Sequence, residues 1–317
     1  MEIGKKIALA IKTIVVVISI SFIGSKLYLE TQDNNILNAF QQITLLKVLL
    51  LVPVFFMVFI NWGIETFKWK FIIKKLQYLS YKESIKAVLA GITVAIFTPN
   101  RVGEFGGRIL ALERKNRIAG VFATLLGGYA QLLITLMFGL LALPIYLKSY
   151  PSQFELNTNY DLFFYISFVV ILIALFVYFK IKFFALLFER YIKNDRKKRF
   201  VSFLKEYQTG ELLTILLLSL TRYLIFTSQF LLLLYFFGIK IPFFQGIMSI
   251  GLVYFIMAII PVVSLFEFGV RGTVAILVLG AFSTSSISII AATLLLWIIN
   301  LALPAAVGSI ALYRLKI

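Results

Sequence analysis

Long stretches without charged residues divide this sequence and constrain its fold more than any other feature. Residues 118–147, 162–179 and 241–266 contain only apolar and uncharged polar side chains. About 20 such residues cross the hydrocarbon core of a bilayer as a helix, which satisfies its own backbone hydrogen bonds in lipid. The strands of a membrane β-barrel would instead alternate apolar and polar residues over about ten positions, and these stretches do not alternate. The sequence therefore predicts an all-α, polytopic membrane protein.

The composition agrees with a membrane protein and excludes several kinds of site. Hydrophobic residues make up 61% of the chain and charged residues 14%, whereas soluble domains contain about 45–50% and about 25%. The chain has no Cys and no His. Thiol catalysis, Ser-His-Asp triads, imidazole proton relays and the common soft-metal sites are therefore excluded. We expect no metal and no cofactor.

The positive charge of the chain is placed where a membrane topology would require it. The 31 Lys and Arg residues exceed the 14 Asp and Glu residues, which gives a net charge of +17. They cluster between the apolar stretches, as is typical of cytoplasmic loops that face anionic lipid. We interpret them as topology signals and expect no nucleic-acid partner. This pattern predicts a multi-pass protein of the cell membrane with both termini in the cytoplasm.

The alternation of apolar stretches and basic clusters predicts one integral membrane domain over residues 1–317. Six full spans are expected at about residues 7–29, 48–64, 118–147, 162–179, 212–237 and 288–312. A cytoplasmic basic loop at about residues 180–208 would carry an interfacial helix at residues 183–192. A rival topology makes residues 244–260 a complete span and places the C-terminus outside.

Two further apolar regions predict re-entrant helical hairpins, which enter the membrane and return to the same side. Residues 84–113 are flanked by basic residues at both ends, and their uncharged part is too short to cross comfortably. Residues 244–282 would form a second hairpin that enters from the opposite side. Two hairpins of opposite orientation form an inverted repeat, which in transporters places the binding site at the repeat interface near the midplane.

The two hairpins share a short motif that contains a charged pair. PNRVGEFGGR begins at Pro99 and PVVSLFEFGVR begins at Pro261, so that both contain E-F-G-x-R. Each proline would end a half-helix. In each copy the Glu and the Arg are four residues apart, a spacing that places them on one face of a helix as a charge pair. The glycines allow close approach of the backbone to a helix or a ligand, and the set predicted to pack in this way is Gly103, Gly106, Gly107 and Gly269.

Six charged residues at membrane depth form the candidate substrate site: Arg101, Glu104, Arg108, Arg222, Glu267 and Arg271. A charge at this depth costs at least ~2.5–3.5 kcal/mol on insertion scales, which favours a functional role. The alternative is that each Glu–Arg pair only holds its hairpin together, and the two roles are compatible. The six residues carry a net charge of +2, which suits a phosphate-bearing headgroup.

Arg222 has no acidic residue nearby in its own helix, so we expect it to pair with Glu104 or Glu267 or to contact a headgroup. Gln229 lies on the same helix face. We expect the two surplus cations, Arg101 and Arg222, to face one shared cavity. Glu65 and Glu113 are predicted at the membrane edge, where water would solvate them and Gln would be tolerated.

Several segments together resemble a known family. TPNRVGEFGGRILAL, GGYAQLLITLMFGLLAL, PVVSLFEFGVRG and LPAAVGSIALYR are similar to the lysylphosphatidylglycerol synthase transmembrane region, also called the flippase-like domain family. The resemblance extends over essentially the whole chain and implies lipid translocation. The full-length synthases of this family continue into an aminoacyl-transferase domain. Since this chain stops at Ile317, we expect no enzyme activity.

The favoured hypothesis is a translocase for an anionic or zwitterionic lipid headgroup. The lipid would be a phospholipid, an aminoacyl-phospholipid or an isoprenoid-phosphate lipid. A second hypothesis is a non-transporting membrane partner that uses its basic loop, residues 180–205, to anchor or regulate a separate lipid-modifying or glycosyl-transferring enzyme. A third is a membrane-embedded transferase with a carboxylate as base, although no nucleotide-binding or metal-ligand cluster is visible in the sequence.

Overall fold

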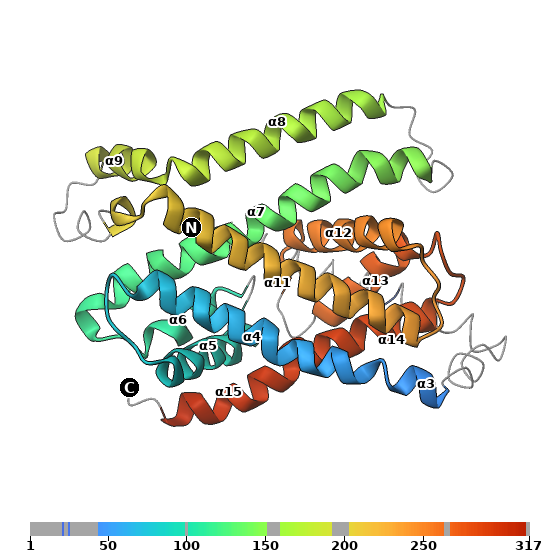
Figure 1. Cartoon of the computed structure of the whole chain (residues 1–317), viewed down its shortest axis with the longest axis horizontal. Coiled ribbons are helices and arrows are strands. Elements are labelled where there is room, and N and C mark those ends of the chain that lie inside the picture. The colour runs from blue at the N-terminus through green and yellow to red at the C-terminus, as the bar shows by residue number, and fades with distance from the viewer. Residues whose placement is uncertain are drawn as a thin grey trace.

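The computed structural model describes Ser21, Ser25 and residues 44–98, 101–150, 159–191, 203–262 and 267–314, which form helices and connecting turns (Figure 1). The helices are α3 (Leu45–Val48), α4 (Leu51–Ile73), α5 (Tyr81–Ile96), α6 (Gly103–Ile109), α7 (Arg117–Ser149), α8 (Tyr160–Phe179), α9 (Ile181–Tyr191), α11 (Thr209–Phe236), α12 (Phe243–Ile259), α13 (Glu267–Leu279), α14 (Ser286–Trp297) and α15 (Leu303–Arg314). Two 3₁₀ turns, η1 (Arg114–Asn116) and η3 (Phe203–Glu206), precede α7 and α11, and the π-helical turn η5 (Ile298–Ala302) joins α14 to α15.

Within the described ranges, five helical segments are long and apolar enough to cross a membrane. They are α4, α7 with its preceding turn, α8, α11 and the continuous α14–η5–α15 segment. The protein is therefore a multi-pass helical membrane bundle, as predicted. Of the sixth predicted span, residues 7–29, the structure describes only Ser21 and Ser25, so this span stays a prediction. The predicted end of the second span at residue 64 is wrong, because α4 continues without a break to Ile73.

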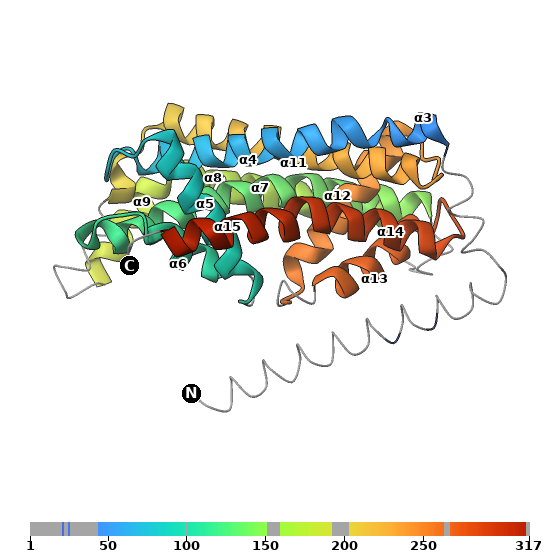
Figure 2. The ribbon, with the colours of Figure 1, turned by 90° about the horizontal axis from the view of Figure 1, so that it is seen from below.

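The two predicted hairpins are present and enter the bundle from opposite ends. α5 packs against α6, and α12 packs against α13. Figure 2 shows α6 and α13 beginning side by side near the middle of the bundle. α12 ends at Ile259, two residues before Pro261, in agreement with the helix end predicted there. Pro99 lies outside the described residues.

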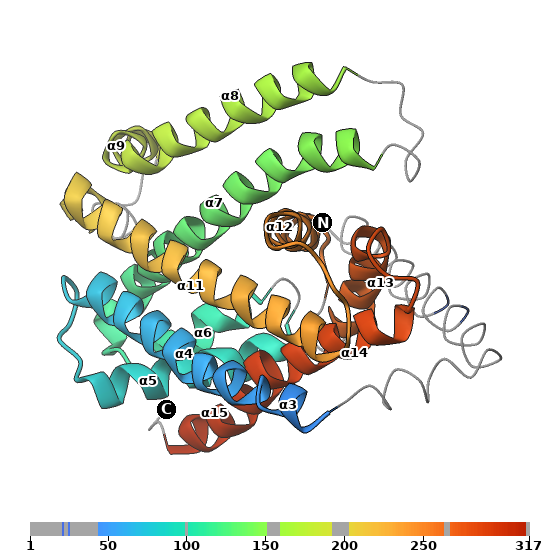
Figure 3. The same ribbon diagram turned by 45° about the vertical axis from the view of Figure 1, so that its right-hand side comes forward.

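The packing of the helices follows an inverted repeat. The series α4–α5–α6–α7 corresponds to α11–α12–α13 followed by the last span, since α5 packs against α15 and α12 packs against α7. α4 and α11 pack against each other and lie side by side along one face of the bundle (Figures 2 and 3). α4 also packs against α5 and α11 against α12, so these two helices can place charged side chains near both hairpins.

Close backbone contacts hold the first hairpin in place. A Cβ atom on Gly107 would lie 2.6 Å from the Ala90 carbonyl oxygen, and one on Gly103 would lie 2.6 Å from the Val94 carbonyl oxygen. These two glycines pack α6 against α5, as predicted. The prediction for Gly106 is wrong, because this residue is exposed and a Cβ there would meet no described atom within 4 Å. In the second hairpin, Gly269 is buried, as expected for a packing glycine.

The first hairpin also contacts the last span directly. The Thr93 hydroxyl donates a hydrogen bond of 2.8 Å to the Ala305 carbonyl oxygen. A Cβ on Gly308 would lie 2.1 Å from the Leu89 carbonyl oxygen, so the backbones of α5 and α15 touch. The last span therefore has a fixed position relative to the first hairpin.

A cap explains where the first hairpin begins. Ser80 accepts a hydrogen bond from the backbone N–H of Glu83, and the Glu83 carboxylate accepts one from the backbone N–H of Ser80. This capping box satisfies N–H groups that the first turn of α5 leaves unpaired. The helix thus starts close to residue 84, the predicted beginning of the hairpin.

The segments predicted to be cytoplasmic gather at one end of the bundle. The ends of α4, α6 and α8, helix α9 and the end of α15 all lie at the left of Figure 1, whereas α3 and the start of α12 lie at the right. The segments that the predicted topology places on the same side of the membrane thus lie at the same end of the bundle. We expect a fluorescent protein that is inactive outside the cytoplasm to fluoresce when it is fused after Ile317, because basic loops stay on the cytoplasmic side. A dark fusion that is correctly inserted would contradict this orientation.

Candidate functional site

A buried carboxylate on α4 connects three elements of the bundle. The Glu65 carboxylate lies 2.7 Å from Arg108 Nη2, 2.8 Å from Arg222 Nη1 and 2.9 Å from Lys68 Nζ. Arg108 also pairs with Glu104, four residues earlier on α6. The side chains of Lys68, Glu65 and Arg108 are only 2%, 5% and 3% exposed. One buried carboxylate therefore forms ion pairs with cations from α4, α6 and α11.

The positions of Glu65 and Lys68 correct the sequence interpretation. Glu65 was expected at the membrane edge and Lys68 among the cytoplasmic basic residues, and both are buried. The cause is the length of α4. Its buried face continues at helical spacing from Trp62 through Glu65 to Trp69, so that both charges point into the bundle. The sequence feature that could have shown this is the set of apolar residues Trp69, Ile72 and Ile73, which continue the buried face of the helix beyond Glu65 and Lys68.

Arg222 pairs with Glu65, and the predicted pairing with Glu104 or Glu267 is wrong. Its Nε also donates to Asn61 Oδ1 at 2.8 Å. The Asn61 amide in turn donates to Asn300 Oδ1 at 3.2 Å. The guanidinium lies 5.0 Å from the Trp62 ring centroid, a distance at which cation–π attraction contributes. Two of its three guanidinium nitrogens, Nε and Nη1, therefore bond residues of α4, which fixes the orientation of Arg222.

Asn300 reaches this site because the last span contains a π-helical turn. Pro304 has no N–H to bond the Asn300 carbonyl four residues earlier, and its ring crowds that carbonyl. The extra residue of the π turn Ile298–Ala302 accommodates the proline without ending the helix. The π turn that Pro304 requires therefore determines the direction in which the Asn300 side chain points.

Two glutamines of the bundle have different surroundings. Gln229 Nε2 donates to the Val54 carbonyl oxygen at 2.9 Å in the core between α11 and α4, and Gln229 is absent from the wall of the cavity described next. Gln131 of α7 lines that cavity. Its Nε2 donates to the Ser219 carbonyl oxygen at 3.4 Å.

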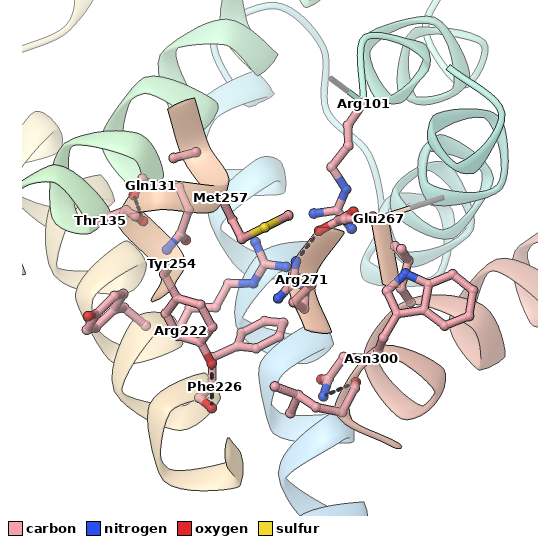
Figure 4. Close-up of a pocket in the computed structure, with 15 residues that line it drawn as sticks. Arg101, Gln131, Thr135, Arg222, Phe226, Tyr254, Met257, Glu267, Arg271 and Asn300 are labelled. Carbon is pink, nitrogen blue, oxygen red and sulfur yellow. Dashed lines mark hydrogen bonds and ion pairs between the residues drawn. The ribbon is translucent and has the colours of Figure 1, made fainter. Parts of the chain in front are cut away.

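Both hairpins contribute to a cavity of about 270 Å³ near the centre of the bundle (Figure 4). Arg101 reaches it from the tip of the first hairpin, Glu267 and Arg271 from the second, and Arg222 from α11. Aromatic side chains form much of the remaining wall; the uncharged lining residues are Gln131, Thr135, Tyr223, Phe226, Tyr254, Met257, Ala258, Leu296, Trp297, Asn300 and Leu301. The cavity therefore combines three cations and one carboxylate with an apolar and aromatic wall.

The structure thus brings together four of the six predicted site residues in one cavity. Arg101 and Arg222, the two surplus cations, both face it, as expected. Glu104 and Arg108 do not line the cavity. Arg108 is connected to it by a chain of ion pairs, since Arg108 bonds Glu65 and Glu65 bonds Arg222, which lines the cavity. With Glu65 and Lys68 included, five cations and three carboxylates lie in this region, and the net charge of +2 is unchanged.

The two charge pairs form as the motif spacing predicted. Arg108 bonds Glu104 within α6, and Arg271 bonds Glu267 within α13, each across four residues. Arg101 differs from these arginines, since no carboxylate of the described chain lies within ion-pair distance of it. Its guanidinium points toward Glu267 of the other hairpin (Figure 4).

The turn that carries Arg101 has an unusual backbone. Arg101 has φ 58°, in the left-handed region, which costs an ordinary residue ~1–2 kcal/mol. The turn is closed by Thr98, whose hydroxyl oxygen accepts a 2.8 Å hydrogen bond from the Gly103 N–H. The strained residue is therefore fixed by its neighbours, and the strain places its side chain in the cavity.

Several polar atoms of the cavity wall have no hydrogen-bond partner in the described part of the chain. They are Arg101 Nε, Arg271 Nε, Gln131 Oε1, Tyr223 Oη and Trp297 Nε1. Buried polar atoms are normally bonded, so this wall is suited to a ligand or water that supplies acceptors for the N–H groups and a donor for Gln131 Oε1. The residues of the described ranges contain no group of three or more metal-ligating side chains. The arrangement therefore favours the binding of a polar, negatively charged group.

The comparison with protein families identifies a match over nearly the whole chain. A family model described as the lysylphosphatidylglycerol synthase TM region matches residues 8–308. The match contains both hairpins and all the charged residues of the cavity. A comparison with curated proteins finds no significant match.

Proposed function

Because the chain belongs to the family of lysylphosphatidylglycerol synthase transmembrane regions, we propose that this multi-pass membrane protein moves a lipid headgroup between the two leaflets. The headgroup is anionic or zwitterionic and carries a phosphate. The lipid is a phospholipid, an aminoacyl-phospholipid or an isoprenoid-phosphate lipid. The protein acts as a flippase-like translocase and not as an enzyme, and the matched family region is the membrane part alone.

The observation that carries this proposal is the cavity between two hairpins that enter from opposite ends. A phosphate cannot cross the hydrocarbon core without polar partners, and arginines at this depth supply them. Arg101 and Arg271 come from different hairpins and line the same cavity. A binding site between inverted halves can be exposed to one side and then to the other when the halves rock against each other.

The size of the cavity agrees with a headgroup as cargo. A volume of about 270 Å³ accommodates a phosphate-bearing headgroup but not two acyl chains. The chains therefore stay in the bilayer while the headgroup passes through the protein. Ala258 of α12 lines the cavity and is itself exposed, which leaves a way out of the cavity on this side.

Filling the cavity should stop transport. We expect Ala258→Trp to slow the movement of fluorescent phosphatidylglycerol across vesicle membranes by at least about tenfold, or ~1.4 kcal/mol in barrier height. The measurement is quenching of outer-leaflet fluorescence by dithionite in vesicles that contain the purified protein. Ile259→Trp is the matched control, because the neighbouring residue is 63% exposed and does not line the cavity. It should keep the original rate.

The same experiment separates the proposal from the non-transporting alternative. A protein that only anchors or regulates an enzyme would leave the quenching rate equal to that of protein-free vesicles. Equal rates in the original protein and in protein-free vesicles, for phosphatidylglycerol, lysylphosphatidylglycerol and a polyisoprenyl phosphate alike, would overturn the proposal.

A further inference from the structure

The two copies of the charged motif are held differently by their surroundings. In the first copy, Arg108 is bonded by two carboxylates, Glu104 and Glu65, and is 3% exposed. In the second copy, Arg271 is bonded by Glu267 alone among the described residues, and its side chain is 17% exposed. The first motif is therefore part of a closed ion cluster, whereas the second faces the cavity.

The sequence shows why the second copy lacks the additional carboxylate. Glu267 and Arg271 each lie 163 positions after Glu104 and Arg108, and the same offset takes Glu65 of α4 to Ser228 of α11. A serine cannot neutralise a cation. At this offset, the first half of the repeat has a carboxylate where the second half has a hydroxyl group.

The charged donors of the cavity that have no hydrogen-bond partner in the described segments lie on two arginines, one from each hairpin. Arg101 Nε and Arg271 Nε are buried without a hydrogen-bond partner in the described segments. Arg222, by contrast, uses Nε for Asn61 and Nη1 for Glu65. Figure 4 shows Arg101 and Arg271 on either side of Glu267. A phosphate at this point would meet donors from both halves of the repeat, with Glu267 as its competitor.

We infer that Arg101 and Arg271 form the phosphate subsite of the cavity, and that Glu267 is a counter-ion which the phosphate displaces. This inference rests on the proposed function and narrows its substrate class to lipids with an anionic headgroup. A negatively charged phosphate at this point would be attracted by the guanidinium groups of Arg101 and Arg271 and repelled by the carboxylate of Glu267 alone. In the opposite assignment, Glu267 would bind the ammonium of a zwitterionic headgroup. The two assignments predict opposite effects of neutralising Glu267.

The test measures binding, which does not depend on transport. Purified protein in an uncharged detergent is titrated with dioctanoyl phosphatidylglycerol, and binding is followed by tryptophan fluorescence, since Trp297 lines the cavity. We expect Arg101→Gln and Arg271→Gln each to raise the Kd by about tenfold or more, because each removes a charge-assisted hydrogen bond to phosphate. Glu267→Gln should lower the Kd by roughly threefold, because it removes the competing anion.

Controls distinguish lost binding from lost folding. Lys148→Gln removes a cation that is 68% exposed outside the cavity and should leave the Kd unchanged. The thermal midpoint of each variant without lipid shows whether it is folded. Arg101→Gln is the variant least sensitive to misfolding, since it breaks no ion pair of the described chain. An unchanged Kd in folded Arg101→Gln, or a higher Kd in Glu267→Gln, would overturn the inference.

Further titrations identify the source of the phosphate. Dioctanoyl phosphatidylglycerol should bind more tightly than inorganic phosphate, dioctanoyl phosphatidylcholine or dioctanoylglycerol. Equal or tighter binding of inorganic phosphate would assign the cavity to free phosphate and overturn the lipid assignment. If binding follows these expectations but vesicles show no transport, the proposed function fails and the subsite stands. If transport occurs without an effect of either arginine, the subsite fails and the function stands.

Discussion

Replacing Glu65 with Gln is expected to destabilise the protein by roughly 3–5 kcal/mol, because it leaves buried cations without their counter-charge. Lys68, Arg108 and Arg222 all depend on this carboxylate, which is 5% exposed. Glutamine keeps the shape of the side chain and one acceptor oxygen but removes the charge. A loss of this size is a large fraction of the stability of most domains.

The effect is measured by thermal unfolding of the detergent-solubilised protein, followed by size-exclusion chromatography with fluorescence detection. Glu113→Gln is the matched control, since the Glu113 side chain is 56% exposed and pairs only with an exposed lysine. It should leave the midpoint within about one degree, as expected for a surface ion pair worth ~0–1 kcal/mol. Equal midpoints for the two variants would show that Glu65 is not the central counter-charge of the cluster.

Replacing Gly107 with Ala should separate α6 from α5 and destabilise the first hairpin by about 1–3 kcal/mol. The added methyl group would lie 2.6 Å from both the Ala90 carbonyl oxygen and the Gly91 Cα, and backbone atoms cannot move aside as a flexible side chain can. Gly106→Ala, one residue earlier, provides the control, because its methyl group would meet no described atom within 4 Å. Alanine there should be neutral or should stabilise α6 by up to ~1 kcal/mol through its helix propensity.

The two alanine variants are compared by the temperature at which the solubilised protein aggregates and by the transport rate in vesicles. Gly107→Ala should lower both values, and Gly106→Ala should change neither by more than the error of the measurement. A reversed order would show that α6 does not pack against α5 through the face that contains Gly107.

Local spacing in the sequence was sufficient to predict the hairpins and their charge pairs. The E-F-G-x-R spacing determines that Glu104 and Arg108, and likewise Glu267 and Arg271, share a helix face, whatever the rest of the chain does. The length of the uncharged stretches likewise predicted the membrane spans that the structure describes. The charge pairs depend only on residues one helical turn apart, and the spans depend only on the composition of one continuous stretch of sequence.

The partner of Arg222 could not be predicted from spacing, because it lies 157 residues away on α4. Two helices that are distant in sequence must first pack before such a pair exists. Glu65 was misplaced for a related reason. The sequence around a charged residue at the end of an apolar stretch resembles that of a loop. Only the packing of α4 against α11 shows that the helix continues inside the bundle.

The π-helical turn in the last span has a mechanical consequence. The part of this span before the turn packs against α13 of the second hairpin, and the part after it packs against α5 of the first. The turn itself carries Asn300, which lines the cavity. A π turn is a weak point of a helix, because its hydrogen bonds are strained relative to the regular ladder. If the two hairpins move relative to each other, we therefore expect this span to bend at the π turn, next to the cavity.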